Sequence, residues 1–271
     1  VRIARDRTGH VITFEDITRQ LLDQRQAAWS DVARRIAHEI KNPLTPIQLA
    51  TERLKRRYGK QIENDPQLFE ELTNTIIRQV GDLRKMVDEF SSFARLPKPV
   101  FRAEDPVDLV RQALFLQEVA RPEVDFAFSA ERAAQERILC DRHQLGQAMT
   151  NVLKNALEAI EARARTEPAG YRGRVAVAMR GAGEAIAVSI TDNGIGLPEG
   201  GERITEPYVT TREKGTGLGL AIVKKIIEEH GGEMTFAPAE GGGTVVTMTF
   251  ARDPLAKGQR ASDSTDKQAA E

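Results

Sequence analysis

The apolar residues of the first hundred positions recur every three or four residues, which predicts two long amphipathic helices. The first runs from about Arg19 to Tyr58, and its apolar face holds Leu22, Trp29, Val32, Ile36, Ile40, Leu44, Ile47 and Leu54. After a break at Gly59 to Pro66 the pattern resumes and ends at Leu96-Pro97-Lys98-Pro99, where two prolines stop the helix. Two helices in a hairpin cannot cover both stripes alone, so we expect a homodimer that forms a four-helix bundle.

From Phe101 onward, signals for helices and strands alternate, which predicts an α/β sandwich. We expect helices near Leu109 to Ala120, from about Arg142 to Ala164, and from about Leu218 to His230. The expected strands lie near Val124 to Phe128, Arg137 to Cys140, Arg174 to Met179, Ala185 to Thr191, Glu233 to Phe236 and Thr244 to Phe250.

Both ends of the chain differ from these two regions. Residues Val1 to Thr18 place Gly9-His10 between two short runs typical of strands, which indicates the last hairpin of a truncated upstream domain. The tail from Arg252 to Glu271 has almost no large apolar residue and is predicted to be disordered. Because the chain starts without Met or a signal peptide, we interpret it as an internal fragment whose parent could be anchored in a membrane.

Composition excludes several classes of protein. Lys and Arg number 39 against 40 Asp and Glu, so a net charge of -1 disfavours nucleic acid as a partner. One cysteine, Cys140, and four scattered histidines do not make a structural zinc site, and they fit a reducing cytoplasm. The sequence has no apolar run near the roughly 18 residues that a membrane span needs.

His38 stands out on the first helix. At 100° per residue it lies about 200° from Ile36 and Ile40, so its imidazole is expected to be exposed, on the same face as Asn42 one turn later. Pro43 and Pro46 should loosen or kink the helix beside it. A solvated surface histidine is the ordinary alternative, but an exposed imidazole can also act as a nucleophile, with Glu39 holding its other ring proton.

Two glycine-rich segments suggest a site for phosphates. Asp192 to Pro198 follows a strand, and Gly215 to Leu220 opens a helix, where backbone N–H groups and the helix dipole suit anions. The P-loop and dinucleotide-binding patterns are absent, and an ordinary turn remains the alternative. Asn151 and Asn155 share a helical face, and their amide oxygens suit Mg²⁺, although surface asparagines would look the same.

Four motifs in this order resemble the H, N and two glycine boxes of sensor histidine kinases of two-component systems. They are His38 to Pro43, Asn151 to Asn155, Asp192 to Gly196 and Gly215 to Gly219. More narrowly, Asn42 to Leu49 and Glu206 to Lys214 resemble the NtrY-type nitrogen-regulation sensor kinases, and Val11 to Thr18 resembles the end of the PAS domain that precedes the helices in that family.

The resemblance implies a dimeric four-helix bundle followed by a two-layer α/β sandwich of the Bergerat or GHKL type. It divides the chain into a PAS-like remnant (1–18), a helical dimerisation and phosphotransfer domain (19–97), a catalytic ATP-binding domain (98–251) and a disordered tail (252–271). It also implies an ATP lid from Gly200 to Lys214, in which Thr205 replaces the Phe that many relatives carry.

The same resemblance assigns roles to single residues. His38 would be the phosphoacceptor, Glu39 its general base, and Asn42 the residue that supports phosphatase activity toward the regulator. Asn155 would coordinate Mg²⁺ with help from Asn151, and Asp192 would accept a hydrogen bond from the adenine amine. The other nucleotide-binding residues would be Gly194, Gly196, Arg212, Lys214, Gly215, Thr216, Gly217, Leu218 and Gly219.

The implied function is an ATP- and Mg²⁺-dependent protein-histidine kinase that phosphorylates itself on His38. It would pass the phosphoryl group to an aspartate of a response-regulator receiver domain, NtrX-like from the resemblance, in nitrogen-related signalling. The fragment would be cytoplasmic and its parent anchored in the inner membrane. Two rivals remain open: a conformational ATPase of the same fold, and a dimeric pseudokinase scaffold. Of the remaining histidines, we expect His143 to be exposed and His230 to be a cation at a helix C-terminus.

Overall fold

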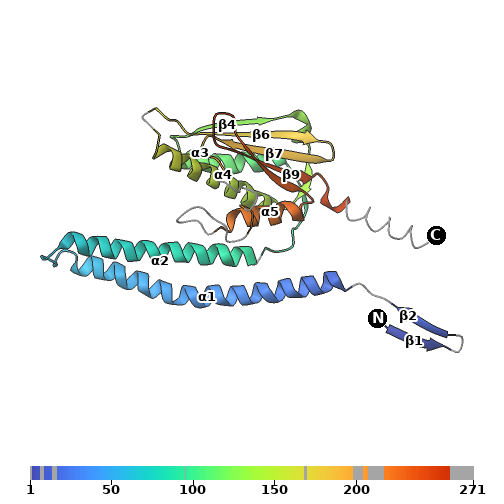
Figure 1. Ribbon diagram of the computed structural model, residues 1–271, viewed down its shortest axis with the longest axis horizontal. Helices are drawn as coiled ribbons and strands as arrows, with labels where there is room; N and C mark the ends of the chain where they lie inside the picture. The colour runs from blue at the N-terminus through green and yellow to red at the C-terminus, as the bar shows by residue number, and fades with distance from the viewer. Residues whose placement is uncertain are drawn as a thin grey trace. The chain divides into compact units, whose positions relative to one another are not determined.

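The computed structural model describes residues 2–6, 9–13, 17–94, 96–167, 170–197, 204–206 and 217–256. The chain divides into two compact units, Val1–Leu96 and Pro97–Glu271, which Figure 1 shows in blue to cyan and in green to red. None of the described helices is long and apolar enough to cross a membrane.

The first unit starts with a small antiparallel hairpin of β1 (Arg2–Asp6) and β2 (Gly9–Thr13). Gly9 pairs with Asp6 and His10 with Arg5, so the expectation that Gly9-His10 links the two strands is wrong. Both residues belong to β2 and pair with β1. Glycine can take part in this pairing because it keeps its backbone N–H and C=O groups.

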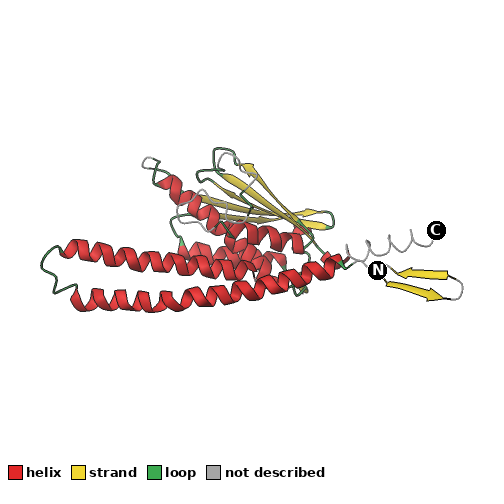
Figure 2. Cartoon of the chain, turned by 60° about the horizontal axis from the view of Figure 1, so that its bottom comes forward, coloured by secondary structure: helices red, strands yellow, loops and turns green. Residues whose placement is uncertain are grey.

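The helices α1 (Thr18–Tyr58) and α2 (Pro66–Ala94) run side by side and antiparallel (Figure 2). Small and medium side chains fill the seam between them: Ala33, Ala37, Leu44 and Thr51 from α1, and Thr73, Val80, Val87, Ser91 and Ala94 from α2. The two helices also meet through Trp29 and Phe90, whose rings pack edge to face with centroids 6.3 Å apart.

Much of the apolar stripe stays exposed in the single chain, as the sequence pattern predicts. The large side chains that remain open to solvent include Val32, Ile36, Ile40, Ile47 and Leu54 of α1, and Leu72, Ile76, Leu83 and Met86 of α2. Exposed apolar residues that repeat along two neighbouring helices form a face that another pair of helices can cover.

The helix α1 continues through Pro43 and Pro46 without interruption, so the predicted loosening does not break it. Each proline removes one N–H from the helix, and the carbonyl groups of Glu39 and Asn42 lose their usual donors. Both of these residues are exposed, and water can take the place of the missing donors. Between the two prolines, the Thr45 hydroxyl donates a hydrogen bond to the carbonyl of Lys41 at 3.3 Å.

The second unit is a two-layer sandwich, with three helices covering one face of a five-stranded sheet (Figure 1). The strand order is β4-β6-β7-β9-β8, with β4 parallel to β6 and every other pair antiparallel. The strands are β4 (Asp125–Ala130), β6 (Arg174–Ala182), β7 (Ala185–Asp192), β8 (Glu233–Pro238) and β9 (Thr244–Ala251). The helices are α3 (Pro106–Ala120), α4 (Arg142–Ala164) and α5 (Gly219–Glu229). A helical hairpin followed by this sandwich confirms the predicted fold class.

The core of the second unit follows from the alternation of its central strands. In β7 the inward positions are Ile186, Val188 and Ile190, and the next inward position is Asp192, which is only 5% exposed. Across the core lies the apolar face of α4, with Leu145, Met149, Val152, Leu153, Ala156, Leu157 and Ile160. The pleat of the sheet therefore brings a carboxylate to the edge of an apolar core.

Two short elements escaped the sequence analysis. The strand β3 (Arg102–Glu104) pairs antiparallel with β5 (Ile138–Cys140), and a 3-10 turn spans Arg132–Gln135. Arg252, expected at the start of the disordered tail, is instead bound into the domain: its backbone N–H donates to the Glu184 carbonyl at 2.9 Å and its guanidinium pairs with Glu136 at 3.1 Å. The tail from residue 257 onward lies outside the described residues.

His230 is fully buried, and the expectation that it is a cation is wrong. The backbone N–H of Asp141 donates to Nε2 at 3.1 Å, so Nδ1 carries the proton and donates to the Ile226 carbonyl at 2.8 Å. Burial lowers the pKa of His230 and outweighs the bond to Ile226 and the charge of Asp141, which act to raise it. The imidazole is therefore neutral, with one fixed tautomer. His143 is exposed on α4, as expected.

The buried His230 predicts an acid-sensitive fold. Its pKa in the folded chain lies below the unfolded value of about 6.5, so the unfolded chain binds more protons below that pH. The free energy of unfolding should fall between about pH 7.5 and pH 5.5, by at most about 1.4 kcal/mol per pH unit for one group. Urea unfolding at several pH values measures it. The control is His143→Gln, which leaves the contacts of His230 intact. If the free energy of unfolding of His230→Asn changed with pH as steeply as that of the parent chain, the assignment would be contradicted.

Candidate functional site

The residues of the predicted phosphoacceptor site lie within two turns of α1 and are open to solvent. His38, Glu39 and Asn42 are all exposed, while Ala37 beside them is buried against α2. In the same stretch, Lys41 forms an ion pair with Asp88 of α2. The imidazole of His38 therefore has no packing role in the hairpin, and it is open to a second macromolecule or domain.

Glu39 pairs with Arg35, which lies one turn earlier on α1. Its carboxylate accepts a hydrogen bond from Nε of Arg35 at 3.0 Å, and both side chains are exposed. Neighbours in sequence point about 100° apart on a helix, whereas residues four apart share a face. An exposed pair at this spacing contributes only about 0.3–0.5 kcal/mol, so Glu39 can exchange Arg35 for another partner at low cost.

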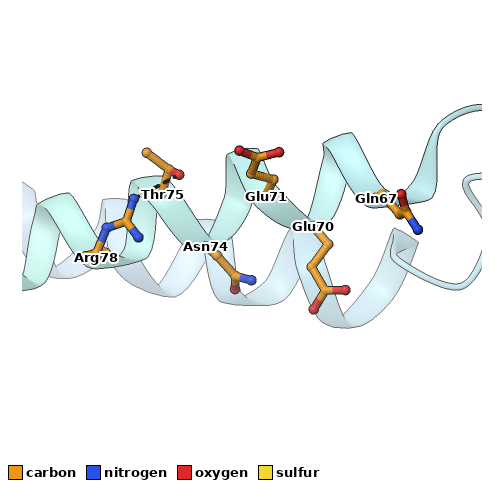
Figure 3. Close-up of a pocket in the computed structure, with 6 residues that line it drawn as sticks. All are labelled: Gln67, Glu70, Glu71, Asn74, Thr75 and Arg78. Atoms are coloured by element: carbon orange, nitrogen blue, oxygen red, sulfur yellow. Dashed lines mark hydrogen bonds between the residues drawn. The ribbon is translucent and has the colours of Figure 1, made fainter. Parts of the chain in front are cut away.

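A separate hollow of about 390 Å³ lies on the outer surface of α2 (Figure 3). Lys55 of α1 reaches its edge, 3.0 Å from the Glu70 carboxylate and 2.7 Å from the Asn74 amide oxygen. The hollow contains none of the predicted site residues, and its walls are polar side chains of one helix: Gln67, Glu70, Glu71, Asn74, Thr75 and Arg78.

In the second unit, the two predicted magnesium ligands lie on α4 near the beginning of α5. Asn151 and Asn155 are both partly buried, one turn apart, and Nδ2 of Asn151 donates to the Gly219 carbonyl at 3.5 Å. Amide oxygens are hard donors of the kind that Mg²⁺ takes alongside phosphate oxygens and water. The two asparagines thus fit a magnesium ion that is shared with a nucleotide, beside the first turn of a helix.

Asp192 organises the turn that follows β7. Its Oδ1 accepts the N–H groups of Gly194 at 2.8 Å and of Thr244 at 3.3 Å, so one buried carboxylate oxygen ties this turn to the start of β9. The turn packs directly on α4: a Cβ at Gly194 would lie 2.6 Å from the Cβ of Ala159. Gly196 adopts φ +82°, a conformation that favours glycine. The first glycine segment is therefore shaped by contact and by backbone conformation.

Arg163 and Tyr171, which sequence reasoning missed, also hold this turn. The guanidinium of Arg163 donates to the Asn193 carbonyl at 2.9 Å and stacks on the Tyr171 ring 5.3 Å away. The Tyr171 hydroxyl donates to the same carbonyl at 3.0 Å, and burial raises the pKa of this tyrosine. Because these contacts join residues about 20 to 30 positions apart without a motif, no spacing in the sequence indicates them.

The second glycine segment is described only in part. Gly217 adopts φ +69°, Leu218 is buried, and Gly219 is the first residue of α5. Arg212, Lys214, Gly215 and Thr216 lie outside the described residues. The end of this segment therefore lies at a helix N-terminus beside Asn151, and the N-terminus of a helix favours anions. Among the described residues, no group of three or more His, Cys, Asp or Glu could hold a metal ion.

Two protein families match successive parts of the chain. Residues 28–99 match the His Kinase A (phospho-acceptor) domain, and residues 140–254 match the family described as histidine kinase-, DNA gyrase B-, and HSP90-like ATPase. His38 falls in the first match. Asn151, Asp192 and Gly219 fall in the second.

Curated relatives agree with both matches. The nitrogen regulation protein NtrY of Azorhizobium caulinodans is 54% identical over 260 residues, which is 94% of this chain and 33% of the relative. The chain belongs to the sensor histidine kinases. An NtrY-like sensor histidine kinase of Rickettsia conorii is 41% identical over 88% of the chain and 39% of its own length. This histidine kinase chain thus spans between a third and two fifths of these relatives.

Solved histidine kinases share the fold. The crystal structure of histidine kinase ThkA in complex with response regulator protein TrrA has a TM-score of 0.60 and 26% identity, and it covers 91% of this chain and 70% of that one. Full-length ShkA in complex with AMPPNP has a TM-score of 0.62 at 23% identity, over 82% of this chain and 46% of that one.

Proposed function

We propose that this histidine kinase chain binds ATP with Mg²⁺ in its second unit and transfers the γ-phosphoryl group to His38. An aspartate of a response-regulator receiver domain then takes the group. The observation that carries the proposal is the exposed His38, on a helix face where it has no packing role, within a match to the phosphoacceptor family. Residues 19–97 serve as the dimerisation and phosphotransfer domain, and residues 98–251 as the ATP-binding domain.

The chemistry at His38 is a nucleophilic displacement at phosphorus. A ring nitrogen forms a bond to the γ-phosphorus while the bond to the bridging oxygen breaks, and ADP leaves with the electron pair. Glu39, whose Oε1 accepts from Arg35 at 3.0 Å, takes the proton from the other ring nitrogen. An aspartate oxygen of the receiver domain next forms a bond to the phosphorus, the P–N bond breaks, and the imidazole regains its proton.

The second unit supplies binding and positioning. Asp192 accepts a hydrogen bond from the adenine amine. The nucleotide is bordered by the glycines at positions 194, 196, 215, 217 and 219 and by Thr216 and Leu218. Asn155 and Asn151 hold Mg²⁺, which neutralises phosphate charge when it is bound. Arg212 and Lys214, which lie outside the described residues, serve as cationic partners of the phosphates. An amide at Asn151 cannot act as a general base toward water, which favours transfer to a histidine over hydrolysis of ATP.

Two copies of the chain form the four-helix bundle. The exposed stripes of α1 and α2 support this, because they leave large apolar side chains such as Ile40 and Leu72 in water until a second pair of helices covers them. The likeness to NtrY supports a role in nitrogen-related signalling, an NtrX-like regulator as partner, and a parent protein anchored in the inner membrane with this part in the cytoplasm. No nucleic acid is expected as a partner at a net charge of -1.

The first prediction concerns His38. In γ-labelled ATP, the parent chain should gain acid-labile protein-bound phosphate, and His38→Gln should gain none, while dimerisation and nucleotide affinity stay within about twofold. Gln keeps a polar, exposed side chain but lacks the nucleophile. His143→Gln, at another exposed histidine, is the control and should label like the parent. Released phosphate without labelled protein would favour the conformational ATPase, and neither product would favour the pseudokinase scaffold.

A second prediction concerns Asp192. In Asp192→Asn, Oδ1 still accepts the N–H groups of Gly194 and Thr244, so the melting temperature should stay close to that of the parent. The new amide replaces an acceptor by a donor, which leaves the adenine amine unmatched at a cost of about 1–3 kcal/mol. Calorimetry should show ATP affinity about tenfold weaker or worse. Asp253→Asn, an exposed aspartate, is the control; unchanged affinity in Asp192→Asn would place the adenine elsewhere.

A third prediction tests the proposed phosphatase activity. Asn42 lies one turn from His38, about 5–6 Å along the exposed face, where its amide can orient a water for attack on an aspartyl phosphate. Asn42→Ala should keep autophosphorylation within about tenfold but slow dephosphorylation of the regulator by about tenfold or more, or about 1.4 kcal/mol of barrier. The assay follows the loss of label from purified phospho-regulator, with Asn64→Ala in the α1–α2 loop as the control. Equal acceleration by Asn42→Ala and the parent would leave Asn42 a structural residue.

A further inference from the structure

The chain segment that enters the second unit is held at three points. Nε2 of Gln144 donates to the Pro97 carbonyl at 2.7 Å, and the Asp141 carboxylate accepts the N–H of Val100 at 2.8 Å. The Phe101 ring then meets the His230 ring edge to face, with centroids 5.3 Å apart. We call these three contacts the linker clamp.

The anchors of the clamp are buried and joined to each other. Gln144 is 4% exposed, Asp141 9% and His230 0%. Asp141 caps the N-terminus of α4, where Oδ1 accepts the N–H groups of His143 at 2.9 Å and Gln144 at 3.1 Å. Its own N–H donates to His230 at the C-terminal end of α5. The clamp is therefore a single polar junction between two helix ends, and it is shielded from water.

Two further features show that the junction is built to hold backbone. Burial alone would raise the pKa of Asp141, but the N–H groups of Val100, Gln144 and His143 lower it, so the carboxylate stays ionised. Gln144 has a buried Oε1 without a hydrogen-bond partner among the described residues. The Gln144 amide therefore contributes to the junction through its donor, which binds the Pro97 carbonyl.

The position of the clamp links the two parts of the proposed reaction. Ala94 is the last residue of α2, whose hairpin partner α1 carries His38, and only two residues separate Ala94 from Pro97. The helices that carry the anchors also carry the nucleotide residues: Asn151 and Asn155 lie on α4, and Gly219 opens α5. The clamp therefore attaches the covalent connection from the phosphoacceptor hairpin to the helices that frame the nucleotide site.

We propose that Asp141, Gln144 and His230 are positioning residues that fix residues 97–101 on the ATP-binding domain and so limit how that domain is presented to His38. This inference rests on the proposed autophosphorylation. A connection with few free torsions reduces the orientations that the two units can sample, and a productive encounter between γ-phosphate and imidazole depends on orientation. Loosening the clamp should slow the transfer while nucleotide binding persists.

The test uses the full chain with Gln144→Met, which keeps the side-chain volume but removes the donor to Pro97. Autophosphorylation should lose about fivefold or more in kcat, while KM for ATP and the melting temperature stay near the parent values. The N–H of Val100 should exchange with deuterium faster than in the parent. Gln147→Met, three residues later on α4 and only partly buried, is the matched control. It should change neither the kcat of autophosphorylation nor the exchange rate of the Val100 N–H.

Phe101→Leu tests the clamp from the linker side, and it serves if Gln144→Met fails to fold. It should give the same fall in kcat with KM unchanged. Faster exchange at Val100 with an unchanged kcat would overturn the positioning role, and so would a rise in KM with kcat preserved. A parent chain that gains no phosphate would instead overturn the proposed function and the kinetic role together, so the two failures can be distinguished.

Discussion

The attachment of α4 at both of its ends is the constraint on which the second unit depends. At the N-terminus, Asp141 caps the helix and binds His230 through its backbone N–H. At the C-terminal end, Arg163 donates to the Asn193 carbonyl, and Gly194 packs on Ala159. An apolar helix face alone could slide along a sheet, because the hydrophobic effect is not directional. The polar contacts at the two ends fix the helix along its axis and thereby place its asparagines.

Among the described residues of this unit, the two buried aspartates, Asp141 and Asp192, are stabilised by backbone N–H groups. Asp141 accepts three such groups, and Asp192 accepts those of Gly194 and Thr244. An isolated buried charge would cost many kcal/mol, whereas charge-assisted bonds to backbone offset much of that cost. Each carboxylate also joins segments that are far apart in the sequence. Both therefore organise backbone, and Asp192 does so at the edge of the proposed adenine site.

Much of the fold could be predicted from local patterns. The period of three to four residues gave α1 and α4 close to their observed bounds, and alternation gave β7 and β9. The three-residue strand β3 could not be recognised, because so short a run carries no period. The ordered position of Arg252 depends on its bonds to Glu136 and Glu184, which are distant in sequence and which no local pattern reveals.

In the candidate site, too, the features set by local patterns were predictable, and those set by distant partners were not. The exposure of His38 followed from helix geometry, and the hydrogen bond from Asn151 to the Gly219 carbonyl brings two of the predicted motifs together. The pairing of Glu39 with Arg35, the neutral state of His230 and the support from Arg163 depend on side-chain choices and burial that the sequence does not encode locally.

The most direct test of the account is to map the phosphorylated residue. The chain would be incubated with ATP and Mg²⁺, digested at neutral to alkaline pH to preserve P–N bonds, and analysed by tandem mass spectrometry. The account predicts phosphate on the imidazole of His38, absent when Mg²⁺ is chelated. Phosphate on any other residue, or an unmodified His38 in a chain that binds ATP, would contradict it.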